Sequence, residues 1–326
     1  MEYAIESGID YFAFYWYDNA MGTARKLYQT SKYNDKVKMC IMFGGGNGDA
    51  EQHQEMAKLL KEDYYMTVLN GRPLMYYDCS YEEAKTSIAY YRGLCEQLDI
   101  PEPYAVCTKA NADKAKLAVA DAIGDYAISN NSLNIPFKTL AANTEKRWMS
   151  HQRSGFQYVP IVTTGYHLLP RFKNQVHWMT IENDKVADYA TAEEIGAHLT
   201  NALNYMQDPE VIERTKANTV LMYAWNEHDE GGWICPTLKV DENGNQLYGE
   251  NGEKLIDTSR IEAIKKAISE FKANNQNKLN NNLGGNENEG NNVLTYILIG
   301  GAVVLVGVAA TVVTVIIKKK KAKGSN

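Results

Sequence analysis

Two glutamates near the end of an apolar segment, Glu227 and Glu230, have the residue type and the spacing for acid–base chemistry. Residues three apart on a helical turn face the same way, with Cβ atoms about 5–6 Å apart. Repulsion between two such carboxylates raises the pKa of one of them, so that one group carries a proton near neutral pH. Cleavage of a glycosidic bond needs this combination of a proton donor and a base or nucleophile. An acidic solvated loop is the alternative interpretation of the same spacing.

The neighbours of these glutamates favour a binding site over a solvated loop. Residues 220–233 read VLMYAWNEHDEGGW, so aromatic, amide and imidazole groups surround the acids. Aromatic rings stack on the apolar faces of sugars, and tyrosine is abundant at 22 of 326 residues, although any single tyrosine can equally fill the core. We therefore predict four substrate-binding residues beside the pair, namely Trp225, Asn226, His228 and Trp233.

The elements that would position this site can be predicted from the alternation of apolar runs with helical patterns. Apolar runs rich in β-branched and aromatic residues predict strands near Tyr11–Tyr15, Val37–Phe43, Pro73–Tyr77, Tyr104–Val106, Tyr126–Ile128, Tyr158–Val162 and Thr219–Ala224. Helical patterns lie between them, and Thr191 with Glu194 forms a capping box. We expect an α/β fold, a (β/α)8 TIM-type barrel that lacks its first strand. An open doubly wound sheet is the competing fold, but no G-x-G-x-x-G follows any predicted strand.

In such a barrel the functional groups lie at the carboxyl ends of the strands. That position selects four further substrate-binding candidates, Tyr15, Tyr17, Asp78 and Tyr166. A metal site is not predicted, because the histidines share no ligand spacing. The five cysteines are widely spaced and form no C-x-x-C, so we expect most of them to be small buried apolar residues.

The longest uncharged apolar segment is 293–317, VLTYILIGGAVVLVGVAATVVTVII. About 20 such residues cross the hydrocarbon core as a helix. The lysines that follow, at 318–321 and 323, favour a cytoplasmic C-terminus. We expect a single-pass cell-membrane protein whose globular domain lies outside the cytoplasm, which requires an export signal that residues 1–17 do not contain. A tail-anchored protein with a cytoplasmic barrel is the alternative.

Composition divides the chain further. We predict a barrel over 1–273, a flexible Asn/Gly-rich stalk over 274–292, the membrane helix over 293–317 and a basic tail over 318–326. The Asn-Gly pairs at 243–244 and 251–252 predict a β-hairpin excursion at about 237–257.

Without the five lysines of the tail, the chain has 29 basic and 40 acidic residues, a formal charge of -11. This charge argues against nucleic acid as a partner.

The run Ala224–Gly231, AWNEHDEG, resembles the W-N-E-W-x-E-G signature of glycoside hydrolase family 99 and its polysaccharide-biosynthesis relatives of the WbsX type. The segment Gly8–Tyr17, GIDYFAFYWY, is similar to their second strand. The resemblance implies a glycoside hydrolase that acts on α-linked, mannan-like glycans without a cofactor. It implies that Glu227 deprotonates the sugar 2-hydroxyl, which attacks C1 to give an anhydro-sugar. Glu230 would then be the general acid and afterwards the base.

Two departures from the signature, His228 and Asp229, leave the substrate open. Two other functions therefore stay open beside the hydrolase. One is a glycosyltransferase-associated protein of the WbsX-type biosynthetic branch. The other is a non-catalytic surface glycan-binding protein, which an incomplete barrel would favour.

Overall fold

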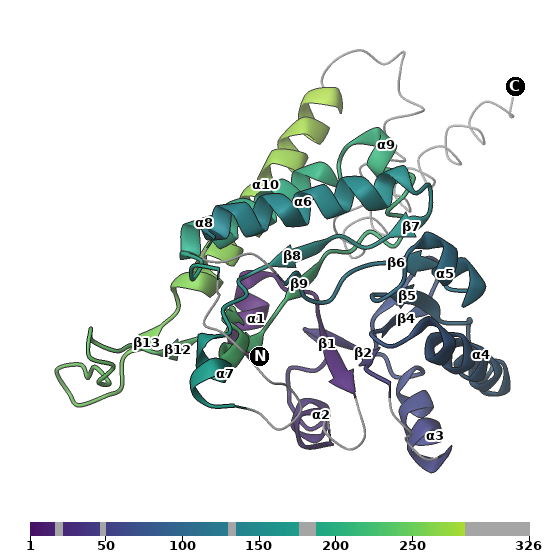
Figure 1. The fold of residues 1–326 in the computed structure, drawn as a ribbon, viewed down its shortest axis with the longest axis horizontal. Helices are drawn as coiled ribbons and strands as arrows, with labels where there is room; N and C mark the ends of the chain where they lie inside the picture. The colour runs from purple at the N-terminus through teal and green to yellow at the C-terminus, as the bar shows by residue number, and fades with distance from the viewer. Residues whose placement is uncertain (17–21, 46–49, 130–134, 176–186, 284–326) are drawn as a thin grey trace, which may run out of the picture. The chain divides into compact units, whose positions relative to one another are not determined.

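The computed structural model describes residues 1–16, 22–45, 50–129, 135–175 and 187–283, and Figure 1 shows its fold. Contacts between residues divide the chain into two units, Met1–Ser269 and Glu270–Asn326. The first unit holds every strand that the structure describes. The last described helix begins in this unit and continues into the second.

A parallel sheet forms the centre of the first unit (Figure 1). Its strands follow the order β1-β2-β4-β5-β6-β7, and the segment of β7 continues through Pro160 into β8, which pairs with β9. A short strand, β3, pairs antiparallel with β4. The bounds are β1 (Tyr11–Trp16), β2 (Lys38–Phe43), β3 (Thr67–Val68), β4 (Arg72–Tyr77), β5 (Tyr104–Cys107), β6 (Ala122–Ile123), β7 (Gln157–Tyr158), β8 (Ile161–Thr163) and β9 (Leu221–Tyr223).

Helices cover the sheet, so its central strands are buried on both faces. In β2, β4 and β5 nearly every residue is buried, which explains their continuous apolar runs. The helices α6 and α8 pack on β8, whereas α4 packs on β5 and α5 on β6 (Figure 1). The helices are α1 (Glu2–Ser7), α2 (Gly22–Gln29), α3 (Ala50–Leu59), α4 (Tyr81–Leu98), α5 (Ala112–Leu117), α6 (Phe137–Arg153), α7 (Leu169–Lys173), α8 (Ala192–Tyr205), α9 (Pro209–Ile212) and α10 (Ser259–Leu283).

The sheet curves until its first and last strands approach each other. The Tyr11 hydroxyl at the start of β1 lies 2.7 Å from Oγ1 of Thr219, just before β9. The ring of Phe12 meets the ring of Trp225 edge-on, with centroids 5.1 Å apart. Among the described strands, none pairs with both β9 and β1 at this position. The predicted α/β class with a parallel sheet is confirmed, and the curvature agrees with a TIM-type barrel.

One predicted strand is wrong. The strand lies at Ala122–Ile123 and not at Tyr126–Ile128, although the other predicted strands coincide with observed ones. The strand ends at Ile123, and after Gly124 the carboxylate of Asp125 is bound to Arg147 and His151 of α6. The apolar run that begins at Tyr126 therefore lies in the loop beyond the strand.

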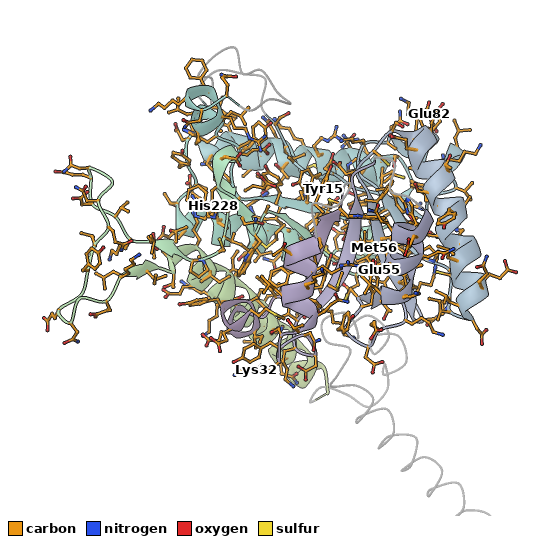
Figure 2. All side chains as sticks on the ribbon, turned by 90° about the horizontal axis from the view of Figure 1, so that it is seen from below. Tyr15, Lys32, Glu55, Met56, Glu82 and His228 are labelled. Atoms are coloured by element: carbon orange, nitrogen blue, oxygen red, sulfur yellow. The ribbon has the colours of Figure 1, made fainter. Side chains whose placement is uncertain are left out.

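Several local predictions are confirmed. The Thr191 and Glu194 side chains form the capping box at the start of α8. The excursion after β9 is an antiparallel hairpin of β12 (Thr237–Leu238) and β13 (Ile256–Asp257), which we call the arm, residues 237–257. Its turns hold Gly244 and Gly252 at φ of 83° and 76°, and it extends away from the sheet in both views (Figures 1 and 2). All five cysteines are free, and four of them are buried.

The C-terminal predictions fall partly outside the described residues. Helix α10 runs to Leu283 and so includes residues 274–283 of the range predicted as a stalk. Across the described ranges, no helix combines the length and apolar character needed to cross a membrane. The predicted membrane helix at 293–317 and the basic tail at 318–326 lie outside these ranges, as does Tyr17.

A buried carboxylate just after β6, that of Asp125, gives a test of the fold. Asp125 accepts hydrogen bonds from Arg147 Nη2 at 2.6 Å and from His151 Nε2 at 2.7 Å. Burial alone would raise the pKa of Asp125, but His151 and Arg147 outweigh it and lower the pKa. A lowered pKa in the folded state stabilises the protein above the ordinary carboxyl pKa of about 3.9, and this contribution is lost as the pH falls.

We expect Asp125→Asn to lower the free energy of unfolding by about 2 kcal/mol at pH 7, because it removes the buried carboxylate that accepts hydrogen bonds from Arg147 and His151. The difference from the unchanged protein should shrink as the pH falls below about 4. Urea unfolding at several pH values measures both. Asp113→Asn, which removes an exposed carboxylate paired with Lys116, is the control and should have little effect. Equal losses in the two variants would contradict the role given to burial.

Candidate functional site

The two glutamates lie on a compact turn that follows β9. It consists of β10 (Asn226–Glu227), the 3₁₀ turn η1 (His228–Glu230) and β11 (Gly232–Trp233). The antiparallel pairing of β10 with β11 places Glu227 opposite Gly232, so the chain turns back within a few residues. The two carboxylates lie close enough that the charge of Glu230 contributes to the raised pKa of Glu227. The prediction that the pair shares one side of a turn is consistent with this geometry.

A buried arginine, Arg171 of α7, contacts the acidic turn. Its Nη1 donates to Oε1 of Glu230, and its Nε donates to Oδ2 of Asp229 at 2.8 Å. Its Nη2 lies 4.0 Å from Oε2 of Glu227. Burial alone would lower the pKa of Arg171, but the three carboxylates outweigh it and raise the pKa. The arginine therefore remains a cation among three acids.

Two tyrosines each donate a hydrogen bond to one glutamate of the pair. The Tyr126 hydroxyl donates to Oε1 of Glu227 at 3.0 Å, and the Tyr223 hydroxyl donates to Oε2 of Glu230. Their rings meet edge-on, with centroids 5.1 Å apart. Burial and the neighbouring glutamates raise the pKa of both tyrosines, so both hydroxyls stay protonated.

The two carboxyls have different charged and hydrogen-bonding neighbours. The pKa of Glu227 is raised, first by burial and then by the charges of Glu230 and Asp229, against the Tyr126 hydrogen bond and Arg171. Glu230 accepts instead from a guanidinium and a hydroxyl. The two carboxyls thus differ in their hydrogen-bond partners, and acid–base catalysis uses two carboxyls in different surroundings.

A second group of predicted residues lies beside the pair. The Tyr15 hydroxyl donates to Oδ2 of Asp78 at 2.7 Å, and the Tyr15 ring lies 5.1 Å from the ring of Tyr126. Asp78 is buried and also pairs with Thr108 and Lys109. The structure thus brings Tyr15 and Asp78 together and links them through Tyr126 to Glu227. Contact of either residue with a sugar stays a prediction, since the Asp78 oxygens already have protein partners.

The two predicted tryptophans are held by different elements. The Trp225 ring packs against Phe12 of β1. Trp233 lies under the guanidinium of Arg260, whose Cζ is 3.6 Å from the ring centroid. Arg260 also donates to the carbonyls of Trp233 and Ala190, at 2.8 Å and 2.9 Å, and burial lowers its pKa to about 10. This arginine therefore fixes the Trp233 ring between the acidic turn and α10.

The remaining predicted residues surround the turn at different depths. Asn226 is exposed, and His228 tilts against the Trp233 ring and lies 3.4 Å from Sγ of Cys235. Figure 2 labels His228 on the side from which the arm leaves. Tyr166, after β8, is close enough to Glu230 that burial and this charge raise its pKa to about 12.

Sequence reasoning missed three of the residues that contact the pair. Tyr126 was placed in a strand, whereas Tyr223 and Arg171 were not singled out. Tyr223 could have been found from its position at the carboxyl end of β9, where functional groups of barrels lie. No local signal marks Arg171, because its partners lie 58 and 59 residues further along the chain.

The described residues contain no group of three or more His, Cys, Asp or Glu side chains placed to hold a metal ion. The acidic turn itself has Arg171 among its carboxylates.

Comparison with known proteins supports the fold. No protein-family model matches the chain, and no curated protein matches it either. Among solved structures, it is similar to the GH99 endo-α-mannosidase from Bacteroides thetaiotaomicron in complex with BIS-TRIS-propane, with a TM-score of 0.57 and 14% identity over 84% of this chain and 83% of that one. A second structure of the GH99 endo-α-mannosidase from that organism gives a TM-score of 0.56 and 13% identity over 83% and 77%.

These likenesses concern the fold. The chain shares with these two structures an α/β fold with a parallel sheet. The resemblance inferred from the sequence is confirmed at this level.

Proposed function

We propose that the protein is a glycoside hydrolase that cleaves α-linked, mannan-like glycans with Glu227 and Glu230 as its reactive carboxyls. The observation that carries the proposal is the pairing of these two acids in a partly buried turn after the last described strand of the sheet. The fold of the chain is similar to that of GH99 endo-α-mannosidases, which supports the same class of reaction.

The proposed chemistry uses no cofactor. Glu230 gives a proton to the glycosidic oxygen as the bond from that oxygen to C1 breaks. Glu227 takes the proton of the 2-hydroxyl, whose oxygen forms the new bond to C1. Water then opens the anhydro-sugar, giving one proton to Glu230 while Glu227 returns its proton to the 2-oxygen.

Substrate contacts are proposed for the residues around the turn. Tyr126 and Tyr223 hold the two carboxyls, which limits their rotation and fixes the distance between acid and base. The proposed sugar-binding residues are Tyr15, Tyr17, Asp78, Tyr166, Trp225, Asn226, His228 and Trp233.

We also propose that residues 293–317 anchor the protein in a lipid bilayer, with the catalytic domain outside the cytoplasm. The length and lack of charge of this segment, together with the lysines after it, support the proposal. A glycan at the cell surface would then be the substrate.

Hydrolysis of a panel of α-mannans and related α-linked glycans by the full chain tests the proposed function. We expect released oligosaccharides, detected by mass spectrometry, and none from a protein that carries both Glu227→Gln and Glu230→Gln. Binding without turnover by both proteins would contradict a hydrolase and favour a surface glycan-binding protein.

A further inference from the structure

Arg171 forms a hydrogen bond with Glu230 but not with Glu227. Both oxygens of Glu230 accept a hydrogen bond, Oε1 from Arg171 Nη1 and Oε2 from the Tyr223 hydroxyl. A protonated carboxyl must donate its hydrogen, and a guanidinium has no acceptor for it. Oε1 of Glu230 therefore cannot carry a proton, and Oε2 could carry one only if the Tyr223 hydroxyl turned to accept it, so these contacts favour the carboxylate.

Glu227 has a different set of partners. Its Oε1 accepts from Tyr126 at 3.0 Å, while its Oε2 lies 4.0 Å from Arg171 Nη2, beyond the reach of a hydrogen bond. The guanidinium cannot turn toward Glu227, because its Nε is bound to Asp229 at 2.8 Å and its donors form a rigid fork. Asp229 thus holds the arginine in the orientation that serves Glu230.

Neither the neighbouring tyrosines nor His228 offsets this difference, and burial lowers the pKa of His228. Tyr126, Tyr166 and Tyr223 remain neutral, since burial and the glutamates raise the pKa of each. The negative charge of Asp229 raises the pKa of Glu227, as the charge of Glu230 does. A proton bound to the pair consequently has Glu227 as its preferred position.

We propose that Arg171 is a positioning residue that assigns the charge within the pair, holding Glu230 as the carboxylate and leaving the proton on Glu227 before a glycan binds. The meaning of this inference for catalysis rests on the proposed function, since the two roles are those of a hydrolase. The acid role proposed for Glu230 then requires a proton, and Glu227 is its source. Transfer of that proton to Oε2 of Glu230, where the Tyr223 hydroxyl can turn to accept it, converts the ligand-free site into one with Glu230 as acid and Glu227 as base, and no other proton is needed.

The charge assignment can be measured without a substrate. In the full chain with ¹³C-labelled glutamate side chains, carboxyl NMR followed over pH reports each titration, and Glu227→Gln and Glu230→Gln identify the two signals. We expect Glu227 to titrate at higher pH than Glu230. In Arg171→Met the pKa of Glu230 should rise by about 1–3 units, because a cation in contact lowers a carboxyl pKa by that amount.

Two further variants control the experiment. Arg147→Met removes a guanidinium that binds Asp125 instead of the pair, and it should leave both titrations unchanged. Arg171→Lys keeps the charge but loses the fork, so it should raise the pKa of Glu230 less, and it serves if Arg171→Met does not fold. The proposal would be overturned if Glu230 titrated at higher pH than Glu227 in the unchanged protein. It would also be overturned if neither Arg171 substitution changed the titration of Glu230. Absence of hydrolysis would overturn the proposed function and leave this titration result standing.

Discussion

Replacement of Glu230 by glutamine is expected to lower kcat for glycan cleavage by about 10²–10⁴-fold, because an amide gives no proton to the leaving oxygen. Glu227→Gln should cause a loss of the same order, since an amide takes no proton from the 2-hydroxyl. Glutamine has nearly the shape of glutamate, so KM should change much less than kcat. Initial rates of oligosaccharide release over a range of glycan concentrations separate the two constants.

The two losses can be told apart by the leaving group. An activated aryl α-glycoside needs no protonation of its leaving oxygen, so Glu230→Gln should recover much of its rate on that substrate. Glu227→Gln should not, because the 2-hydroxyl still needs a base. Glu213→Gln, which alters an exposed carboxylate paired with Lys216, is the matched control and should keep full activity. Recovery by Glu227→Gln in place of Glu230→Gln would show that the two roles are exchanged.

The sequence singles out Glu227 and Glu230 because type and spacing are local properties. Glu227 ends β10 and Glu230 ends the η1 turn that follows it, so the two acids lie on one short segment of the chain. Tyr15 and Asp78 were found for a similar reason, since each follows the apolar run of a parallel strand and such strand ends meet at one edge. The sequence therefore predicts which residues lie at the end of a strand.

The partners of the pair could not be predicted in the same way. Tyr126 reaches Glu227 across 101 residues, and Arg171 reaches Glu230 across 59. Such contacts depend on how loops from different strands meet, which no local pattern encodes. The misplaced strand at Tyr126–Ile128 has the same origin. Its apolar run resembles a strand, but β6 spans only Ala122–Ile123, and the loop beyond it brings Tyr126 to the site.

The sequence pattern also does not decide whether the sheet curves into a barrel. Alternating strands and helices are compatible with an open sheet or a barrel, and the choice depends on contacts between the first and last strands. The hydrogen bond between the hydroxyls of Tyr11 and Thr219 and the packing of Phe12 on Trp225 supply those contacts. The membrane helix at 293–317 stays a prediction, because it lies outside the described residues.

The acidic turn is held against the loop after β8 by two glycines whose backbones touch. A Cβ on Gly165, which has φ of 141°, would collide with the carbonyl oxygen of Gly231. Gly231 cannot retreat easily, because it has φ of 71° and packs against His167, whose N–H donates to the carbonyl of Glu230 at 2.6 Å. The position of Glu230 therefore depends on the absence of a side chain at residue 165.

We expect Gly165→Ala to lower the free energy of unfolding by about 2–4 kcal/mol, from the collision and from the strained backbone together. It should also abolish hydrolysis, because relief of the collision moves the turn that carries Glu230. Denaturant unfolding and hydrolysis rates measure the two effects. Gly155→Ala is the matched control, since Gly155 has φ of 71° but open space around a Cβ. It should lose only about 1–2 kcal/mol and keep its activity. If the two variants lose equal stability and both stay active, the contact of Gly165 with Gly231 does not position Glu230.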